Sequence, residues 1–378
     1  MFKPMKKIFS AFAAVILLLS SCIAEEPLNM ECDILGFDEA WLGPYREAGF
    51  VVGEPLVRNN DVTLTFLRGM DRSFLDPVFI ITDSATISPA NGSKHDFSFP
   101  VEYTVTSQDG CWSKKYTVRM QYPTPIKEFH FEHFDLDKTG KYYEFFEIGD
   151  TPDDTLRYWA SGNPSYKLTG VAKSREDFPT CSWPNGYIGN CVRLRTVSTG
   201  GFGKMTNPKM PIAAGNLFLG KFNDKIAMRQ PLQATEFGLQ LVDSKPISLE
   251  GYYKYKAGSP VKDQNDEVIA DMQDTCDIYS VVYEVDPNRF VPLDGENVLS
   301  SDRIVMMARI DKPGEPQEWT HFIEPYKMMP GKVWDEQRMA NNGYAIAVVM
   351  TSSRQGAYFI GALDSELFVD EVKINWEK

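Results

Sequence analysis

Aromatic residues stand beside residues able to hydrogen-bond to hydroxyl groups in two segments, YWASGNP (158–164) and WPNGY (183–187). Sugar rings have flat C–H faces on which Trp and Tyr rings stack, while Asn, Asp or Arg side chains bind the hydroxyls. The two segments therefore predict a sugar-stacking surface made by Trp159, Trp183 and Tyr187. The alternative is that these rings only pack in the core or within loops.

Paired carboxylates would indicate a different chemistry, the hydrolysis of glycosidic bonds. That reaction needs two facing acids, about 5 Å apart for retention or about 6.5–9.5 Å apart for inversion. The chain contains 52 Asp and Glu residues, so the sequence alone selects no pair. Acids in apolar surroundings are the better candidates for a raised pKa. They are Glu236, Asp271, Asp277 and Glu324.

Metal binding and nucleophilic catalysis find little support in the sequence. FHFEHFD (129–135) has histidines at a helical spacing, but its phenylalanines alternate, so we expect a strand with those rings inward. DLDKTG (135–140) begins like a calcium loop, yet Phe146 occupies the twelfth position, where a glutamate is required. An ordinary Asp/Gly turn is therefore expected there. No G-x-S-x-G motif occurs, and no histidine lies near Ser352 in the sequence.

The elements that must position these residues are β-strands. Aromatic residues make up 13% of the chain, which has 27 Gly, 24 Pro and few Ala/Leu-rich stretches. Such a composition indicates an all-β fold. Alternating runs at 101–106 and 116–120 flank a Gln-Asp-Gly turn and predict a hairpin. Runs at 62–67 and 78–82 also have strand composition.

The segment 87–118, which contains PVEYTV, DG and YTV, resembles the small immunoglobulin-like spacer domains of bacterial surface lipoproteins. This resemblance implies an Ig-like β-sandwich over residues 30–122. Two prolines at 123–125 predict a semi-rigid linker. Residues 126–378 then form a second predicted domain.

The second domain is predicted to be a β-sandwich. Its clearest strands are 304–310, 344–350 and 367–374, whose apolar or alternating character suits packed sheets. A short helix is expected only around 335–341.

The amino terminus predicts export. Lysines precede an apolar stretch at 8–19, which is too short to span a bilayer, so residues 1–21 read as a signal peptide. Leu19-Ser20-Ser21-Cys22 matches a lipobox, which predicts lipidation of Cys22 and a tether at 22–29. Location as a surface-exposed outer-membrane lipoprotein would follow. The alternative is an ordinary secretory signal that happens to contain a cysteine.

The net charge indicates which partners to expect, and the cysteine positions indicate which disulfides the sequence allows. The formal net charge of the full chain is −13. Residues 1–21 contain three lysines and no acidic residue, so removal of the predicted signal peptide would change the net charge to −16. A strongly acidic protein repels nucleic acid phosphates and anionic lipid headgroups, so neither is an expected partner. Cys181 and Cys191 are close enough in sequence for a disulfide across one loop, and Cys32 has Cys111 as a candidate partner. Buried free thiols are the alternative for both pairs.

The second domain resembles the putative carbohydrate metabolism domain (PCMD) of bacterial surface lipoproteins. Matching motifs run across nearly all of 126–378: WASGNP, AAGNLFLGKF, RQPL, GYYKYKAG, DIY and TSSRQGAYFIGALDSELFVDEV. The resemblance implies a jelly-roll β-sandwich, preceded by an Ig-like domain and linked to glycan handling. Residues inside these motifs are Asn163, Asn216, Tyr253, Asp277, Ser353 and Asp370. Asn163, Asn216 and Tyr253 thereby join the three aromatic residues as candidate ligand-binding residues.

Sugar-binding jelly rolls often hold a structural calcium ion, for which Asp370 or Glu371 would be ligands. A solvent-facing pair at a strand end is the expectation we prefer, with no cofactor. The leading functional hypothesis is a non-catalytic surface protein that binds an oligo- or polysaccharide, with neighbouring glycan-utilisation proteins as further partners. A glycoside hydrolase is the alternative, and an adhesive or structural module that binds a protein is a further alternative.

Overall fold

The computed structural model describes residues 28–66, 70–121, 127–148, 155–156, 158–238, 240–286 and 290–377. The predicted signal peptide, Cys22 and the predicted linker at 123–125 lie outside these residues. Within the described residues, no helix is long and apolar enough to cross a membrane. The described chain forms two compact units, one of 28–66 and 71–121 and one of Met70 and 127–377.

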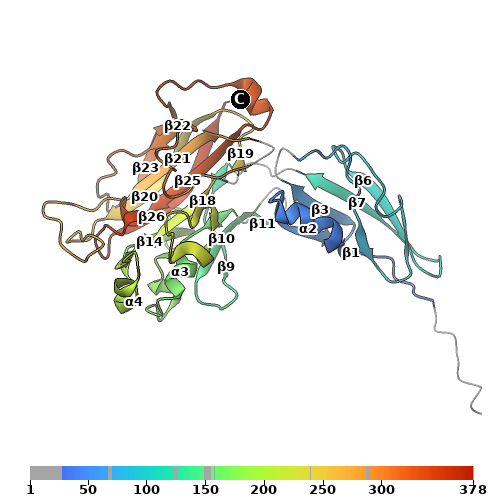
Figure 1. Ribbon diagram of the computed structural model, residues 1–378, viewed down its shortest axis with the longest axis horizontal. Coiled ribbons are helices and arrows are strands. Elements are labelled where there is room, and N and C mark those ends of the chain that lie inside the picture. The colour runs from blue at the N-terminus through green and yellow to red at the C-terminus, as the bar shows by residue number, and fades with distance from the viewer. Residues whose placement is uncertain are drawn as a thin grey trace, which may run out of the picture. The chain divides into compact units, whose positions relative to one another are not determined.

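The first unit contains a five-stranded sheet in the order β2-β3-β7-β6-β5 and a two-stranded sheet of β1 and β4 (Figure 1). Its strands are β1 (Ile34–Phe37), β2 (Val51–Arg58), β3 (Asp61–Phe66), β4 (Phe79–Ile81), β5 (Thr86–Ser88), β6 (Val101–Thr106) and β7 (Ser113–Gln121). β6 and β7 form the predicted hairpin, with Tyr103 opposite Tyr116. Alternation buries Tyr103, Val105, Tyr116 and Val118 on one face of this hairpin.

A helix in the first unit was not predicted. α2 (Glu39–Glu47) begins after Asp38, whose carboxylate accepts a hydrogen bond from the Ala40 N–H at 2.7 Å. The sequence obscures this helix because Gly43 and Pro44 lie within it, and both residues disfavour helix interiors. The helix buries Leu42, which anchors it to the rest of the unit.

The second unit is built on two large antiparallel sheets. The eight-stranded sheet contains β12 (Trp159–Ala160), β17 (Asn216–Phe222), β18 (Thr235–Phe237), β19 (Gln240–Leu241), β21 (Asp277–Glu284), β22 (Ile304–Arg309), β24 (Lys327–Met328) and β25 (Tyr344–Thr351). The six-stranded sheet contains β8 (Glu128–Phe129), β13 (Thr180–Pro184), β14 (Asn190–Arg195), β20 (Pro246–Lys256), β23 (Thr320–Pro325) and β26 (Glu366–Trp376).

Shorter elements complete the second unit. The strands are β9 (His133–Leu136), β10 (Tyr143–Ile148), β11 (Thr155–Leu156), β15 (Val197–Ser198) and β16 (Ile212–Ala213). The helices are α3 (Asn163–Lys167), α4 (Gly200–Met205), α5 (Asp224–Ala227) and α6 (Glu336–Ala340), with single 3-10 turns η1 (Arg175–Asp177) and η2 (Gly356–Tyr358). α6 confirms the helix expected around 335–341.

The fold is an all-β sandwich, as the composition indicated. β21 and β25 are buried along almost their whole length because both of their faces are covered. One face meets the six-stranded sheet: Trp159, opposite Leu219 of β17, packs on Phe129 of β8 with ring centroids 5.1 Å apart. The other face carries a second apolar cluster that includes Phe218, Tyr279 and Val349. This outer face, with the segments that cover it, supports the cavity described next.

Candidate functional site

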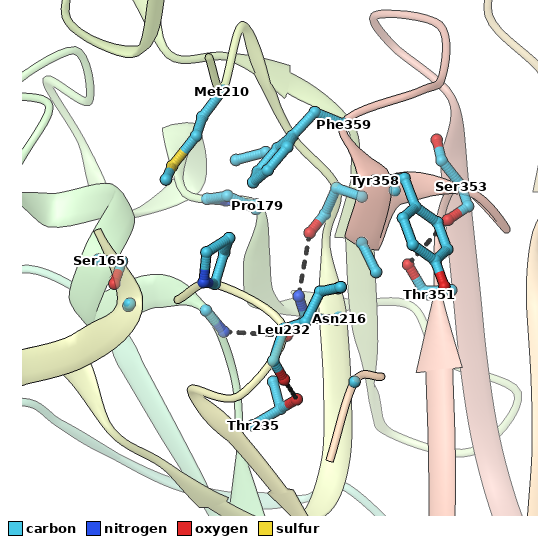
Figure 2. A pocket seen from close by; sticks show the side chains of 18 of the residues that line it. Ser165, Pro179, Met210, Asn216, Leu232, Thr235, Thr351, Ser353, Tyr358 and Phe359 are labelled. Carbon is cyan, nitrogen blue, oxygen red and sulfur yellow. Dashed lines mark hydrogen bonds between the residues drawn. The ribbon is translucent and has the colours of Figure 1, made fainter. Parts of the chain in front are cut away.

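A cavity of about 330 Å³ lies on the outer face of the eight-stranded sheet (Figure 2). Its floor comes from β17, β21 and β25, and its walls come from α3, α4, α5, η2 and the segment 295–300. This volume lies at the lower end of the range for small-ligand sites in proteins. The position and size therefore suit a small ligand or one unit of a larger one.

The polar part of the floor is a row of three side chains in register. Asn216 pairs with Thr351, which pairs in turn with Asp277 on the next strand. Because strand side chains alternate between faces, residues paired in this way point to the same side of the sheet. The Asn216 carboxamide accepts a hydrogen bond from the Gly162 N–H at 2.9 Å and donates to the Ala214 carbonyl at 3.2 Å. This row places hydrogen-bonding groups of three strands side by side.

Asp277 is almost fully buried, at 1% exposure, and is held by two arginines. Arg309 Nε and Nη2 donate to its two carboxylate oxygens at 2.8 and 2.6 Å. Arg354 Nη2 forms an ion pair with Asp277 Oδ1 at 3.4 Å and donates to the Ile310 carbonyl at 3.0 Å. The bidentate pair with Arg309 fixes the plane of the carboxylate. The fixed carboxylate in turn pairs with Arg354, which lines the cavity.

Two aromatic residues on the turn after β25 border the cavity. Tyr358 is 55% exposed, and Phe359 directly follows it. Phe359 has φ 59° and ψ 30°, a left-handed conformation that is rare for bulky residues. Such conformations cost roughly 1–3 kcal/mol, persist only where the surrounding structure enforces them, and gather at functional sites. The strained turn thus contributes two rings to the cavity lining, Tyr358 on the side of Thr351 and Phe359 on the side of Met210 (Figure 2).

A buried polar network fixes this turn. Asp274 Oδ2 accepts hydrogen bonds from Ser353 Oγ at 2.6 Å, Ser365 Oγ at 2.7 Å and the Ala362 N–H at 2.7 Å. Ser353 Oγ is also 2.5 Å from Thr196 Oγ1. All of these side chains are buried, so removing one partner would leave others unsatisfied. Ser353 lines the cavity, but its hydroxyl is fully buried and engaged by Asp274 and Thr196, so it acts to position the aromatic turn.

These features come from segments spread over most of the second unit, and that unit matches a known family. Residues 130–375, more than half of the chain, match the family described as "Putative carbohydrate metabolism domain" (PCMD). The chain belongs to the PCMD family. Residues 53–120 of this PCMD protein match a second family, described as "SGBP, N-terminal". The family resemblance inferred from the sequence motifs is therefore confirmed.

Solved structures similar to this PCMD protein include two from Bacteroides. One is a putative glycoside hydrolase from Bacteroides thetaiotaomicron, 40% identical, with 94% of this chain and 99% of that chain covered and a TM-score of 0.66. The other is a putative glycoside hydrolase from Bacteroides vulgatus, 37% identical, with 66% of this chain and 98% of that chain covered and a TM-score of 0.60. No curated protein matches the chain significantly.

Three of the predicted ligand-binding residues lie in the protein interior, where their polar atoms hydrogen-bond to other protein groups. Trp159 is 8% exposed, packs on Phe129 and donates its indole N–H to Glu147 at 3.3 Å. The Asn163 carboxamide donates to the Thr180 carbonyl at 2.7 Å and is fully buried. Tyr253 is buried and donates its hydroxyl to the Pro313 carbonyl at 2.6 Å. The prediction is wrong for these residues, because their polar atoms and ring faces already have partners inside the protein.

Trp183 lies on the outer face of the six-stranded sheet, away from the cavity floor. The Arg193 guanidinium lies 4.3 Å from its ring centroid, and Arg193 pairs with Phe368 across the sheet. Lys254, the next partner of Phe368, has its Nζ 5.2 Å from the Phe368 ring and 4.6 Å from the Trp319 ring. Rings and cations thus alternate across this face, with cation–π contacts between Arg193 and Trp183 and between Lys254 and both Phe368 and Trp319.

Tyr187 lies on the same sheet face as Trp183. It is 45% exposed and stacks on Tyr252, with ring centroids 3.6 Å apart and an interplanar angle of 9°. Of the six predicted residues, Asn216 alone lines the cavity. The predicted surface is therefore divided between two different sheets.

The predicted Cys181–Cys191 disulfide is absent, and both thiols are free and buried. Cys181 pairs with Arg193 and Cys191 with Trp183, so the two cysteines are diagonal neighbours on β13 and β14. Diagonal neighbours lie roughly 7–8 Å apart, beyond the reach of an unstrained disulfide. Cys32 and Cys111 are also free. Burial raises the pKa of Cys181 to about 11 and that of Cys191 to about 12.

Thiol counting tests this correction. A chain of residues 23–378, denatured without reductant, is expected to react with a thiol reagent at five cysteines, those at positions 32, 111, 181, 191 and 276. In the native protein the buried cysteines should react slowly, because thiolate is the reactive form and is scarce at a raised pKa. A count of three in the denatured protein would show that one of the pairs forms.

Asp370 and Glu371 were expected at a strand end, facing solvent, and the structure corrects this. They lie within β26, where Asp370 pairs with Tyr252 and Lys373 with Glu250, which leaves one extra residue on β26. Such a β-bulge redirects side chains, and Glu371 has φ 49° there. Asp370 is 0% exposed, because the loop between β13 and β14 covers it and its carboxylate accepts the Ile188 N–H at 2.9 Å.

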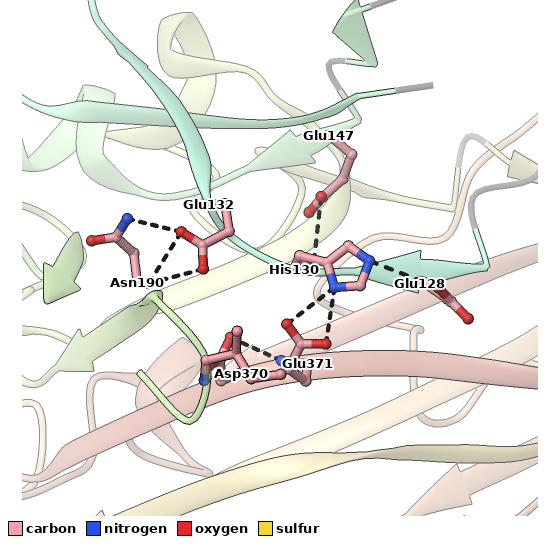
Figure 3. A network of polar contacts seen from close by, with 8 residues as sticks. Glu128, His130, Glu132, Glu147, Asn190, Asp370 and Glu371 are labelled. Carbon is pink, nitrogen blue, oxygen red and sulfur yellow. Dashed lines mark hydrogen bonds and ion pairs between the residues drawn. The ribbon is translucent and has the colours of Figure 1, made fainter. Parts of the chain in front are cut away.

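Figure 3 shows Asp370 within a larger polar network. Glu132 accepts hydrogen bonds from the Asn190 N–H and side-chain amide at 3.0 and 2.9 Å, and His130 contacts Glu371 at 2.9 Å. Burial, reinforced by the Glu371 charge, raises the pKa of Asp370 to about 7 despite its N–H partners. The described residues contain no cluster of three or more His, Cys, Asp or Glu arranged to hold a metal ion.

The remaining candidate acids lie apart from the cavity. Of Glu236, Asp271, Asp277 and Glu324, Asp277 alone lines it.

The DLDKTG segment forms the turn between β9 and β10, in which Asp137 accepts hydrogen bonds from Thr139 Oγ1 at 2.6 Å and the Lys141 N–H at 2.6 Å. Against the effect of burial, these bonds lower the pKa of Asp137. The ordinary-turn interpretation therefore describes this segment well.

Sequence reasoning did not single out Tyr358, Phe359, Arg309 or Arg354. Tyr358, Phe359 and Arg354 lie inside the motif TSSRQGAYFIGALD, which carried the family resemblance. The consecutive aromatic residues Tyr358 and Phe359 in this motif could therefore have been chosen as candidate ligand-binding residues. Arg309 had no such signal, because it meets Asp277 only through the pairing of β21 with β22.

Proposed function

We propose that this protein binds carbohydrate in the cavity on the outer face of the eight-stranded sheet. The observation that carries the proposal is the in-register row of Asn216, Thr351 and Asp277 in a cavity that the rings of Tyr358 and Phe359 also line. Hydrogen-bonding groups beside aromatic faces match the two kinds of surface of a sugar ring. Membership of the PCMD family supports the same ligand class.

Binding is favoured over hydrolysis by the state of the acids in the cavity. Hydrolysis needs two carboxyl groups, one of which must present a proton to the glycosidic oxygen. Of the acids lining the cavity in the described chain, Asp277 has both oxygens engaged by Arg309, and Glu296 accepts from the Gln233 amide at 3.1 Å. Hydrolysis remains the second candidate because two similar structures carry the description of putative glycoside hydrolase.

The proposal extends to the cellular setting. A lipid at Cys22 would anchor the mature protein to the outer membrane, where an Ig-like first domain at 30–122 acts as a spacer and the domain at 126–378 meets glycans. The lipobox sequence and the match of 53–120 to the family "SGBP, N-terminal" support this arrangement. Metabolic labelling of the producing bacterium with a fatty-acid analogue tests it, since labelling should vanish in Cys22→Ala.

A glycan array followed by calorimetry tests the binding site. We expect the mature chain to bind at least one glycan and Tyr358→Ala to weaken that binding by about tenfold or more, because exposed aromatic anchors carry much of the binding energy at such sites. Tyr358 is exposed, so the variant should fold normally.

Tyr187→Ala is the matched control, since it removes an equally exposed ring from the six-stranded sheet. Binding that is lost in Tyr187→Ala and kept in Tyr358→Ala would place the site on the other sheet. Release of sugars from the bound glycan would establish hydrolysis. Binding to no glycan at all, together with capture of a protein partner, would favour the adhesive alternative.

A further inference from the structure

The cavity has two chemically different ends. One end holds the polar row of Asn216, Thr351 and Asp277. The other end is formed by apolar side chains of Phe202, Met210, Ile212 and Phe359. In Figure 2, Met210 and Phe359 appear on one side of the cavity, and Thr351 and Ser353 on the other.

The segments that carry these apolar side chains lie in close contact with one another and form one wall of the cavity. The Met210 N–H donates to the Gly203 carbonyl at 2.8 Å, which places Phe202 of α4 next to Met210. A Cβ added to Gly356 would clash with the Cβ of Ala214, so the η2 turn that leads to Phe359 lies directly against the segment 210–214. The wall therefore reaches from α4 to the aromatic turn.

Three hydroxyl groups among the cavity-lining residues already donate within the protein, whereas the buried Ser165 Oγ, which also lines the cavity, has no hydrogen-bond partner among the described residues. Thr199 Oγ1 donates to the Met210 carbonyl at 2.6 Å, Thr235 Oγ1 to the Leu232 carbonyl at 3.0 Å and the Tyr166 hydroxyl to the Ser198 carbonyl at 3.1 Å. A sugar hydroxyl packed against these apolar side chains would lose its water in a region with few hydrogen-bonding groups. Burying a hydroxyl is unfavourable where partners are few, so an apolar substituent suits this end of the cavity better than a hydroxyl does.

We infer that the ligand is an acylated sugar, whose ring lies on the polar row and whose acetyl or larger acyl group fills the apolar end. The methyl group of an acetyl substituent would pack on Phe202, Met210 and Phe359, where apolar contact is favourable. Amide-linked and ester-linked acetyl groups share this chemistry. The inference rests on the proposed carbohydrate binding and narrows it to one ligand class.

Matched pairs of sugars test the inference and separate the two linkages. N,N′-Diacetylchitobiose and cellobiose differ by an acetamido group in place of the 2-hydroxyl on each ring, and O-acetylated xylo-oligosaccharides can be compared with the same sample after alkaline deacetylation. We expect the acetylated member of at least one pair to bind roughly tenfold more tightly, the usual discrimination from one apolar group in a matching pocket. Calorimetry with the mature chain measures both members of each pair.

Variants of the wall locate the effect. Phe202→Ser and Met210→Gln should remove the preference for the acetylated member by lowering its affinity more than that of the other member. Ile323→Ser, which changes an exposed apolar residue on β23, is the control and should keep the preference. Phe202 is partly exposed, so Phe202→Ser keeps the test decisive if Met210→Gln fails to fold.

The outcomes distinguish this inference from the proposed function. Equal affinity for both members of each pair would overturn the acyl inference and leave carbohydrate binding intact. A preference that persists in both wall variants would also overturn it, because the acyl group would then lie elsewhere. Binding to none of these sugars and to no glycan on an array would overturn both proposals.

Discussion

Asp277→Asn is expected to destabilise the second unit by about 3–5 kcal/mol, because Asp277 is buried and two partly buried arginines would lose their carboxylate partner. Arg309 donates to both oxygens of Asp277, and Arg354 lies 3.4 Å from one of them. Asparagine has nearly the same shape as aspartate, so the loss of stability reflects the removed charge and not a change in side-chain volume. For a unit of this size the melting temperature should fall by roughly 6–20 °C, measured by scanning calorimetry.

Asp266→Asn is the matched control for this prediction. Asp266 also contacts two cations, Lys204 at 2.5 Å and Lys262 at 3.0 Å, but at the surface. Exposed ion pairs contribute about 0–1 kcal/mol, so this variant should melt close to the wild type. Similar losses in both variants would show that burial of the Asp277 pair has no special effect. A double-mutant cycle with Arg309→Gln would then measure the pairwise coupling directly.

The second large effect is a pH dependence of stability caused by Asp370. Its pKa is raised to about 7 in the folded protein, whereas an exposed aspartate in the unfolded chain has the ordinary value of 3.8. Between these two values the folded state keeps a proton that the unfolded state has released. The free energy of unfolding must therefore fall as pH rises from about 4 to about 7, by up to about 4 kcal/mol, and this contribution stays constant above pH 7.

Denaturant unfolding at several pH values checks this prediction in the wild type and in Asp370→Asn. The variant has no proton to lose at this position, so the difference between the two free energies should change across this window. If the free energies of unfolding of the wild type and of Asp370→Asn change in parallel from pH 4 to pH 8, the prediction is contradicted. A carboxyl-carbon NMR titration of the wild type gives an independent measurement, in which Asp370 should titrate well above ordinary aspartates. Glu147, whose pKa burial also raises, contributes with the same sign in both proteins.

Much of the fold was predictable because its signals are local. The hairpin of β6 and β7 followed from alternation around an Asp-Gly turn, and β22, β25 and β26 followed from apolar runs of strand length. α2 was missed because its sequence contains Gly43 and Pro44, and the packing of Leu42 outweighs their low helix propensity. The bulge at Glu371 was missed because it depends on how β26 pairs with β20.

The site was predictable only in part, because burial is decided by distant pairings. Trp159 and Trp183 both precede turn-forming residues, but the partner of Trp159 in β17 directs its ring into the core. Asn216, predicted through the family motif to bind a ligand, lies in the cavity lining, and its role in binding stays a prediction. The contact of Asp277 with Arg309 joins residues 32 positions apart, and no local pattern indicates it. Phe359 is exposed to the cavity by a backbone conformation that sequence composition does not encode.

The division of the cavity between strands and connections has an evolutionary consequence. The polar floor belongs to β17, β21 and β25, whose residues also hold the core, so substitutions there carry a cost in stability. The apolar wall belongs to α4, η2 and their neighbouring connections, which can change in length and composition while the sheets stay intact. Members of this family that face different glycans should therefore diverge first in these wall segments and keep the floor. One scaffold can thus acquire new ligand preferences through small, separable steps.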